Sequence, residues 1–318
     1  MATIYDIAKK TGISKSTVSR VVSGNGYVSE DKRQTILNAM HELNYIPNQM
    51  AKNLRNKRTN TIGFLVNDYL PLVGEFINVF TNIAAKNNYS VNVYFTKTAE
   101  NEINTLNLLT IRALDAVFIL TRINSWDLIS SYAKFGPIST WQRVENPNIY
   151  SNYVDHYPIY LKILERLDKQ GYTKIGHVFS TIRNANTRAR VQAIEDFSTK
   201  HPNSDQTYQL FYHGQSNAGQ DSAMKWLGLI NRPQVMIFFA DYVAAEFMTT
   251  LRKHHVKIPE NCVVIGSDNS EIAELMNIPT VDLCFRSQAQ NGFIYLYNQL
   301  NKKQLPFQKQ NPKWIPGY

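Results

Sequence analysis

Residues 3–22 decide the fold of the N-terminal region and read Thr-Ile-Tyr-Asp-Ile-Ala-Lys-Lys-Thr-Gly-Ile-Ser-Lys-Ser-Thr-Val-Ser-Arg-Val-Val. Thr3 and Asp6 have the spacing of a capping box, in which each residue satisfies a free N–H of the other at the start of a helix. Gly12 suits the left-handed residue that ends such a helix, and Ser14 can cap the next one. The stretch therefore predicts two short helices joined by a tight turn.

The second of these helices has two chemically different faces. Its apolar face, which would pack on neighbouring helices, consists of Val18, Val21 and Val22. Its opposite face carries Lys15, Ser16 and Arg20. A third amphipathic helix is expected from Ser29 onward. Two short helices of this kind form a helix-turn-helix module, whose second helix enters a DNA major groove with its polar face on base edges.

The charge distribution agrees with a DNA-binding role for this region. Residues 1–58 contain ten Lys and Arg against four Asp and Glu, so they carry +6 of the chain's formal +9. An excess of Lys and Arg side chains can neutralise the phosphate groups of a DNA backbone. The alternative is a small helical domain whose basic side chains are merely solvated.

The segment after the third helix extends the pattern. Residues 44–54 read Asn-Tyr-Ile-Pro-Asn-Gln-Met-Ala-Lys-Asn-Leu. Residues 3–54 together resemble the N-terminus of the lactose-repressor/galactose-repressor family of bacterial transcription regulators, with its motifs T-I-x-D-[VI]-A, G-[VI]-S-x-x-T-V-S-R-V and Y-x-P-N-x-x-A-x-x-L. The resemblance implies a helix-turn-helix domain at 1–47 and a hinge helix with its linker at 48–60.

By this resemblance, Arg20 is the expected guanine reader, through two hydrogen bonds to O6 and N7. Leu54 matches the wedge that the family inserts into the minor groove, and residues 48–53 match its hinge helix. The alternative for Leu54 is a linker residue packed on the core. The full set of expected DNA-binding residues is Thr3, Tyr5, Ser14, Lys15, Ser16, Thr17, Ser19, Arg20, Asn25, Asn48, Ala51, Leu54 and Arg55.

From residue 61 onward, short apolar runs alternate with segments of helical periodicity. The runs begin near residues 61, 91, 116, 137, 174, 234 and 262. This alternation is typical of an α/β fold with parallel sheets covered on both faces. The resemblance implies a two-lobed core like that of the periplasmic sugar-binding proteins at 61–318. Its first lobe is expected at about 61–156 and 286–304, and its second at about 157–285 and 305–318, with crossings near Asp155, Phe285 and Leu305.

Polar residues at the ends of the expected strands are the candidates for binding an effector between the lobes. Asp268 in Ile-Gly-Ser-Asp-Asn and Arg190 in Thr-Arg-Ala-Arg-Val match the family's aspartate and arginine, and together they suit a polyol. The alternative is an Asp–Arg ion pair that only ties loops together. The expected effector-binding residues are Asp68, Tyr69, Trp141, Gln142, Arg143, Asp155, Arg190, His213, Asp241 and Asp268.

Four departures from the family pattern limit the prediction of the ligand. Gln142 replaces a usual aspartate, Ala240 stands where asparagine is common, and Arg286 replaces a glutamine. A short insertion blurs the alignment of His213 with the family's ring-stacking aromatic. Trp141 could stack on a sugar ring, although a tryptophan at a strand end more often belongs to the core.

The remaining features bound the class of protein. Cys262 and Cys284 are the only cysteines and are expected to be buried thiols, and no run of eighteen apolar residues occurs, so we expect a soluble cytoplasmic protein. No phosphate loop, G-x-S-x-G motif or paired metal-binding histidines are found, so neither an enzyme nor a bound cofactor or metal is expected.

The sequence therefore favours a homodimeric repressor of a sugar operon that binds a palindromic operator and a small effector. The alternatives are a regulator that responds to a purine or to a partner protein, and a sugar-binding protein without a DNA role.

Overall fold

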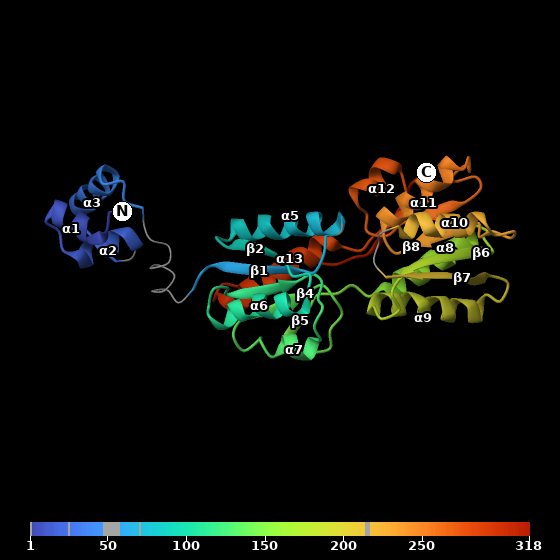
Figure 1. Cartoon of the computed structure of the whole chain (residues 1–318), viewed down its shortest axis with the longest axis horizontal. Coiled ribbons are helices and arrows are strands. Elements are labelled where there is room, and N and C mark those ends of the chain that lie inside the picture. Colours follow the sequence, from blue (N-terminus) through green and yellow to red (C-terminus); the bar gives the residue numbers. More distant parts are fainter. Residues whose placement is uncertain (1, 25, 47–57, 70, 214–216) are drawn as a thin grey trace. The chain divides into compact units, whose positions relative to one another are not determined.

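The computed structural model describes residues 2–24, 26–46, 58–69, 71–213 and 217–318, and it divides between Thr59 and Asn60 into two compact units. The first unit contains the helices α1 (Ile4–Thr11), α2 (Lys15–Ser23) and α3 (Glu30–Glu42) (Figure 1). No helix among the described residues is long and apolar enough to cross a membrane.

The predicted signals that start and end the first helices are confirmed. The backbone N–H of Thr3 donates to Asp6 Oδ2 at 2.8 Å, and the N–H of Asp6 donates to Thr3 Oγ1 at 3.4 Å. Gly12 ends α1 with φ of 69°, and Ser14 caps α2 by accepting from the N–H of Thr17. Ser29 precedes α3 but makes no side-chain capping bond. The core of this unit consists of Ile7, Val18, Val21, Val28, Ile36 and Ala39.

The second unit contains two α/β lobes. The sheet of the first lobe has the order β2-β1-β3-β4-β5, all parallel. Its strands are β1 (Thr61–Val66), β2 (Ser90–Phe95), β3 (Ala116–Ile119), β4 (Ile138–Thr140) and β5 (Ile149–Ser151). Its helices are α5 (Pro71–Lys86), α6 (Ala99–Thr110), α7 (Trp126–Ser130) and α13 (Phe285–Leu300).

Successive strand residues in this lobe point to opposite faces, and both faces are covered. Phe64 and Phe118 pack with residues of α5 and α13, whereas Leu65 and Val117 pack with residues of α6 and α7. All four side chains are fully buried. The first lobe therefore has the doubly covered parallel sheet that its apolar strands predict.

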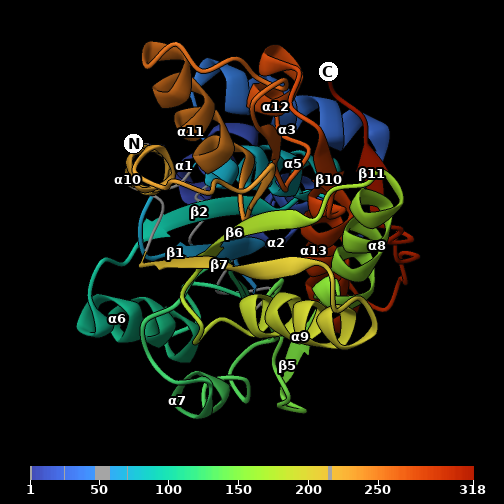
Figure 2. The ribbon, with the colours of Figure 1, turned by 90° about the vertical axis from the view of Figure 1, so that its right-hand side faces the viewer.

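The sheet of the second lobe has the order β7-β6-β8-β9 and is also parallel. Its strands are β6 (Lys174–Ser180), β7 (Asp205–Tyr212), β8 (Val235–Phe238) and β9 (Val263–Ile265). One face packs on α8 (His156–Lys169) and α9 (Ala185–Lys200), and the other on α10 (Ala218–Leu227) and α11 (Asp241–Lys253) (Figure 2). The short helix α12 (Glu271–Met276) follows β9.

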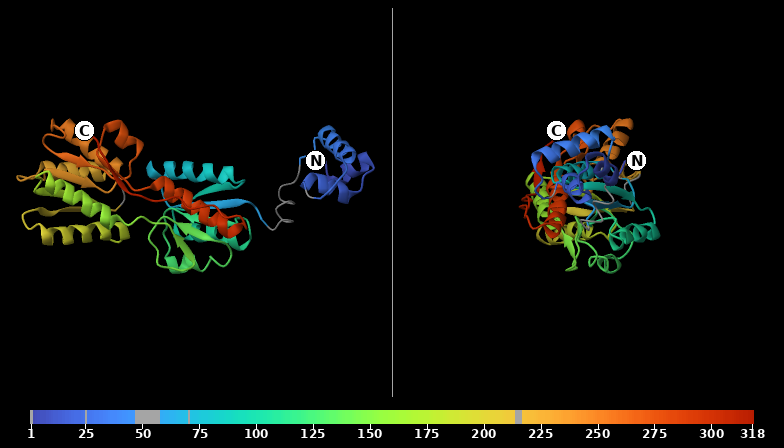
Figure 3. Two further views of the ribbon diagram at one scale, coloured as in Figure 1. Left: turned by 180° about the vertical axis from the view of Figure 1, so that it is seen from behind. Right: turned by 90° about the vertical axis from the view of Figure 1, so that its left-hand side faces the viewer.

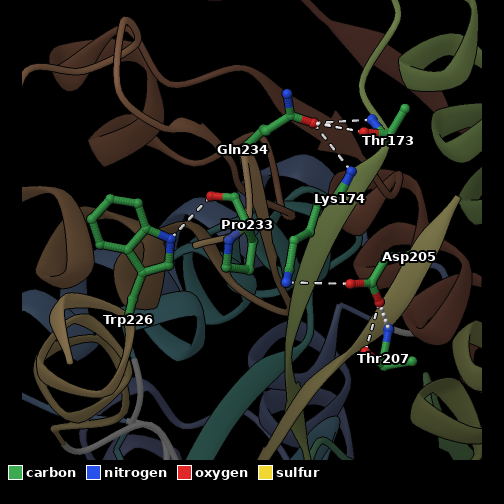
Figure 4. Close-up of polar contacts among 7 residues, drawn as sticks. All are labelled: Thr173, Lys174, Asp205, Thr207, Trp226, Pro233 and Gln234. Atoms are coloured by element: carbon green, nitrogen blue, oxygen red, sulfur yellow. Dashed lines mark hydrogen bonds and ion pairs between the residues drawn. The ribbon is translucent and has the colours of Figure 1, made fainter. Parts of the chain in front are cut away.

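Polar contacts fix the amino ends of three strands of this sheet (Figure 4). Gln234 Oε1 accepts from the N–H groups of Thr173 and Lys174, at 3.0 and 3.1 Å, and so joins β8 to β6. Lys174 pairs with Asp205 at 3.3 Å and joins β6 to β7. These side chains stabilise the sheet at the amino ends of its strands, away from the carboxyl ends where ligands of such sheets bind.

The chain runs between the lobes in three segments, of which the green and the red ones are seen from behind in Figure 3. They follow β5, follow β10 (Thr280–Asp282) and precede β11 (Lys313–Ile315), and β10 and β11 pair antiparallel in the second lobe. The predicted third crossing at Leu305 is wrong. Leu305 bonds to Asn298 of α13 and Phe307 stacks on Tyr150, so 305–310 pack on the first lobe and the chain crosses just before Lys313.

One buried amide joins the first crossing segment to α13 and to the start of the third segment. Asn152, in the first segment, donates through Nδ2 to the carbonyl of Gln288 in the first turn of α13 at 2.9 Å. Its Oδ1 accepts from Nε2 of Gln310, just before the third crossing, at 2.8 Å. The first and third segments are therefore tied to each other and to α13 at a single side chain.

Candidate functional site

The polar face of α2 is open to solvent. Lys15, Ser16 and Arg20 are exposed, and Lys15 Nζ lies 4.3 Å from the centre of the Tyr5 ring, which is 56% exposed. Ser14, Thr17 and Ser19 are exposed or half-buried on the same helix or at its cap. Thr3 has a different role, because its hydroxyl is engaged with Asp6 in the cap of α1.

Part of the predicted DNA-binding set lies outside the described residues. These positions are Asn25, Asn48, Ala51, Leu54 and Arg55, together with the expected hinge helix. An aromatic residue that the sequence reasoning missed lies near α2: Tyr27 is 89% exposed. Gly26 beside it has φ of 93°, and a Cβ there would lie 3.4 Å from Cδ of Arg20. The signal that could have found Tyr27 is an aromatic residue directly after a glycine turn.

Arg190 and Asp268 come together in the second lobe. Arg190, on α9, is only 5% exposed, and its Nε donates to His156 Nδ1 at 3.2 Å. Asp268 follows β9 and is half-buried, with φ of 129°. Burial and the charge of Asp241 raise the pKa of Asp268 well above its usual value, while the nearby Arg190 charge opposes the rise.

The described residues do not contain the direct ion pair between Asp268 and Arg190 that was the alternative prediction. Neither Arg190 nor Asp268 belongs to an ion pair within the described chain, although their charges affect each other. The terminal nitrogens Nη1 and Nη2 of Arg190 make no hydrogen bond to any described residue, and they are not among the buried polar atoms that lack a partner, so they reach solvent. A largely buried guanidinium thus presents two donor groups near a carboxyl group, which suits a ligand with oxygen atoms.

Asp241 is not available to a ligand, which corrects its predicted role. Its side chain is fully buried and accepts from the N–H and hydroxyl of Ser270, at 2.8 and 2.9 Å, and from the hydroxyl of Thr280 at 2.5 Å. Gly266 lies against it so closely that a Cβ there would be 2.0 Å from Asp241 Oδ1. Asp241 therefore holds the loop after β9, which carries Asp268.

In the first lobe, Trp141 and Gln142 bond to the protein itself. Trp141 Nε1 and Gln142 Nε2 both donate to the carbonyl of Leu120, at 2.6 and 2.9 Å. The Trp141 ring packs edge-on against Phe76 and Phe285, with centroids 5.6 and 5.3 Å apart. The contacts of Trp141 therefore favour a role in the hydrophobic core over stacking on a sugar ring.

The remaining predicted effector-binding residues are all exposed at the surface. Arg143 is exposed and stacks over Tyr153, and Asp155 caps α8 by accepting from the N–H of Tyr157 at 3.0 Å. Asp68 and His213 are exposed, and Tyr69 is 64% exposed. None of these five residues lines the larger cavity of the core.

That cavity, of about 350 Å³, lies where the second and third crossing segments meet Asp268. Among the predicted residues only Asp268 lines it. The side chains that sequence reasoning missed include Glu75, Lys309 and Lys313, and Arg286 pairs with Glu75 at 3.3 Å. A smaller cavity, of about 200 Å³, lies under residues 314–318 and contains none of the predicted residues.

Cys284 also lines the larger cavity and is only half-buried, so its predicted burial is wrong, whereas that of Cys262 is confirmed. Cys284 is not part of a strand. It has φ of 60° and is the residue directly before α13, within the second crossing segment.

Comparison with known proteins gives matches along nearly the whole chain. The model of the family described as bacterial regulatory proteins, lacI family, matches residues 3–48, and a periplasmic binding protein-like domain matches residues 164–313. The chain is 31% identical over 293 residues to the NTD biosynthesis operon regulator NtdR of Bacillus subtilis, covering 89% of this chain and 88% of that one.

Two solved structures show the same fold. The lac repressor dimer bound to operator and the anti-inducer ONPF has a TM-score of 0.80 at 22% identity, over 94% of this chain and 92% of that one. A regulator from Lactobacillus casei with bound sucrose has a TM-score of 0.72 at 23% identity, over 81% of this chain and 98% of that one.

Proposed function

This chain belongs to the lacI family of bacterial regulatory proteins, and from that membership we propose that it is a repressor of a sugar-utilisation operon. It binds a palindromic operator as a homodimer through α2, and a small polyhydroxylated effector held at Arg190 and Asp268 controls its affinity for that operator. Relatives described by their operator, anti-inducer and sucrose complexes support this combination of partners.

The observation that carries the effector proposal is the state of Arg190. Burying a cation is costly unless its charge and its N–H groups are satisfied. Arg190 is only 5% exposed, and its Nε is bonded to His156, whereas Nη1 and Nη2 have no partner in the described chain and remain accessible to solvent or a ligand. Two hydroxyl oxygens would accept from this fork, while Asp268 would accept from the hydroxyl protons.

The DNA-binding part rests on charge and exposure. The exposed residues of α2 are Lys15, Ser16 and Arg20, and the opposite face of this helix is buried. A single recognition helix reads few base pairs, so a two-fold dimer on a palindrome doubles the site.

Replacement of Arg20 tests the DNA interface. Arg20→Ala should cost about 1–3 kcal/mol of operator binding and relax the preference at one base pair of each half-site, because a bidentate contact to guanine is lost. Fluorescence anisotropy with a library of half-site variants measures both effects. Arg252→Ala, an exposed arginine of α11 in the core, is the matched control. Unchanged discrimination at every base pair would remove Arg20 as the reader.

Replacement of the two charged groups tests the effector site. The full chain is first screened by thermal shift against glucose, sucrose, cellobiose and adenine, the last representing a purine effector. Arg190→Ala and Asp268→Ala should abolish the response of operator binding to the compound found, while operator affinity without it stays within about tenfold. Arg188→Ala, exposed on the same helix, should respond like the wild type. A full response in both site variants would exclude these residues from the pocket.

A further inference from the structure

His156 is a buried histidine that the proposed function does not yet use. It is 6% exposed, and its Nδ1 accepts the hydrogen bond from Arg190 Nε at 3.2 Å. It is also the first residue of α8, directly after the first crossing between the lobes. The residue thus connects the arginine of the candidate site to the point where the chain enters the second lobe.

The donor and acceptor chemistry fixes the state of this histidine. A guanidinium group has only donors and stays charged in proteins, so Nδ1 of His156 must present its lone pair. The imidazole is therefore neutral and carries its proton on Nε2. Burial and the adjacent Arg190 charge agree with this, since both lower the pKa of His156 well below its usual value.

A second residue of α8 holds the guanidinium from another direction. Tyr160 lies one turn after His156, on the same side of the helix. The centre of its ring is 5.7 Å from Cζ of Arg190, and its hydroxyl is bonded to His177 Nδ1 at 2.7 Å. His177 is in turn bonded to Gln206 at 2.8 Å, so the Tyr160 ring cannot turn freely.

We infer that His156 is the positioning residue for Arg190: it occupies Nε, so that Nη1 and Nη2 face the effector as a rigid fork. This inference rests on the proposed function and adds a ligand class to it. A fork with Nε occupied presents two parallel donors, which match two adjacent oxygen atoms, as in a vicinal diol. A ligand that offers a single acceptor would cover both N–H groups but pair with only one of them, and would bind more weakly.

The first experiment is isothermal titration of the full chain with glucose, sucrose and cellobiose. His156→Leu, which removes the acceptor, should weaken binding of the sugar that binds the wild type about 10- to 100-fold, because Nε is left unsatisfied and the fork can turn. His156→Asn, whose Oδ1 can stand near the place of Nδ1, should bind within about threefold of the wild type. Wild-type affinity in His156→Leu, or equal loss in both variants, overturns the inference.

A second measurement requires no ligand and separates this inference from the proposed function. In the full chain labelled with ¹⁵N, the Nε–H signal of Arg190 is assigned by its loss in Arg190→Lys. Its proton should exchange with water at least about tenfold more slowly in the wild type and in His156→Asn than in His156→Leu, because a buried hydrogen bond must open first. Rapid exchange in the wild type overturns the positioning role. Slow exchange without binding of any of the three sugars upholds His156 and contradicts the sugar proposal alone.

Discussion

The two lobes of the core use polar side chains at their strand ends in different ways. In the first lobe, Trp141 and Gln142 donate to the main chain of Leu120. In the second lobe, Arg190 makes one hydrogen bond, through Nε, and packs on the Tyr160 ring, and Asp268 affects its charge without a direct ion pair. The first of these arrangements contributes to stability, whereas the second leaves Nη1 and Nη2 of Arg190 without a protein partner. Under the proposed function, direct recognition of the effector would therefore come from the second lobe.

The largest expected effect concerns a carboxylate of the second lobe that serves structure. Asp241→Ala should lower the free energy of unfolding by about 4 kcal/mol, because the N–H and hydroxyl of Ser270 and the hydroxyl of Thr280 lose their acceptor in a buried place. Urea denaturation of the full chain, followed by circular dichroism, measures this. A loss below about 1 kcal/mol together with an abolished effector response would instead place Asp241 among the recognition groups.

The next effect is a dependence of the second lobe on pH. Burial lowers the pKa of His177 to about 4, although its hydrogen bond to Gln206 opposes the shift. As the pH falls, His177 therefore becomes protonated in the unfolded chain before it does in the folded chain. The stability that comes from keeping His177 neutral is complete above about pH 6.5 and should fall by about 3 kcal/mol as the pH drops to about 4. His177→Gln should reduce the fall in stability between pH 6.5 and 4, measured by urea denaturation, by about 3 kcal/mol, while the buried His156 keeps its own contribution. Replacement of the exposed His213 by glutamine should leave the fall unchanged. An unchanged slope in His177→Gln contradicts the assignment.

The smallest expected effect tests the first lobe. Trp141→Phe should cost about 1 kcal/mol of stability, since one hydrogen bond is lost but Leu120 keeps the amide of Gln142. Its sugar affinity should stay within about threefold of the wild type, as measured by the same titration. A loss of affinity as large as that of Arg190→Ala would show that both lobes recognise the ligand directly, and the contrast between them would fail.

Sequence reasoning succeeded where the determining interactions are local. The cap of α1 depends on residues three apart, and the amphipathic helices of the core depend on spacing within one turn. β7 was missed because it is an edge strand with polar residues such as Gln209. The third crossing was misplaced because the attachment of Leu305 depends on its contact with Asn298, which no spacing reveals.

The candidate site shows the same limit. Arg190 and Asp268 could be proposed from the sequence because each stands in a motif, and in the structure their charges affect each other. Asp241 stands in a motif as well, but its bonds to Ser270 and Thr280 occupy it, which the motif does not show. His156 could not be identified, because its meaning depends on a contact with a residue 34 positions away.

The amide of Asn152 gives the core a mechanical property. Three separate connections could each bend by a different amount, and the lobes would then occupy a continuum of orientations. Because Asn152 of the first connection bonds to Gln288 of α13 and to Gln310 at the start of the third, displacing the first or the third connection by itself strains or breaks the shared bonds. These two connections are therefore coupled where they leave the first lobe. A rearrangement of the lobes that keeps both bonds must move the two connections together.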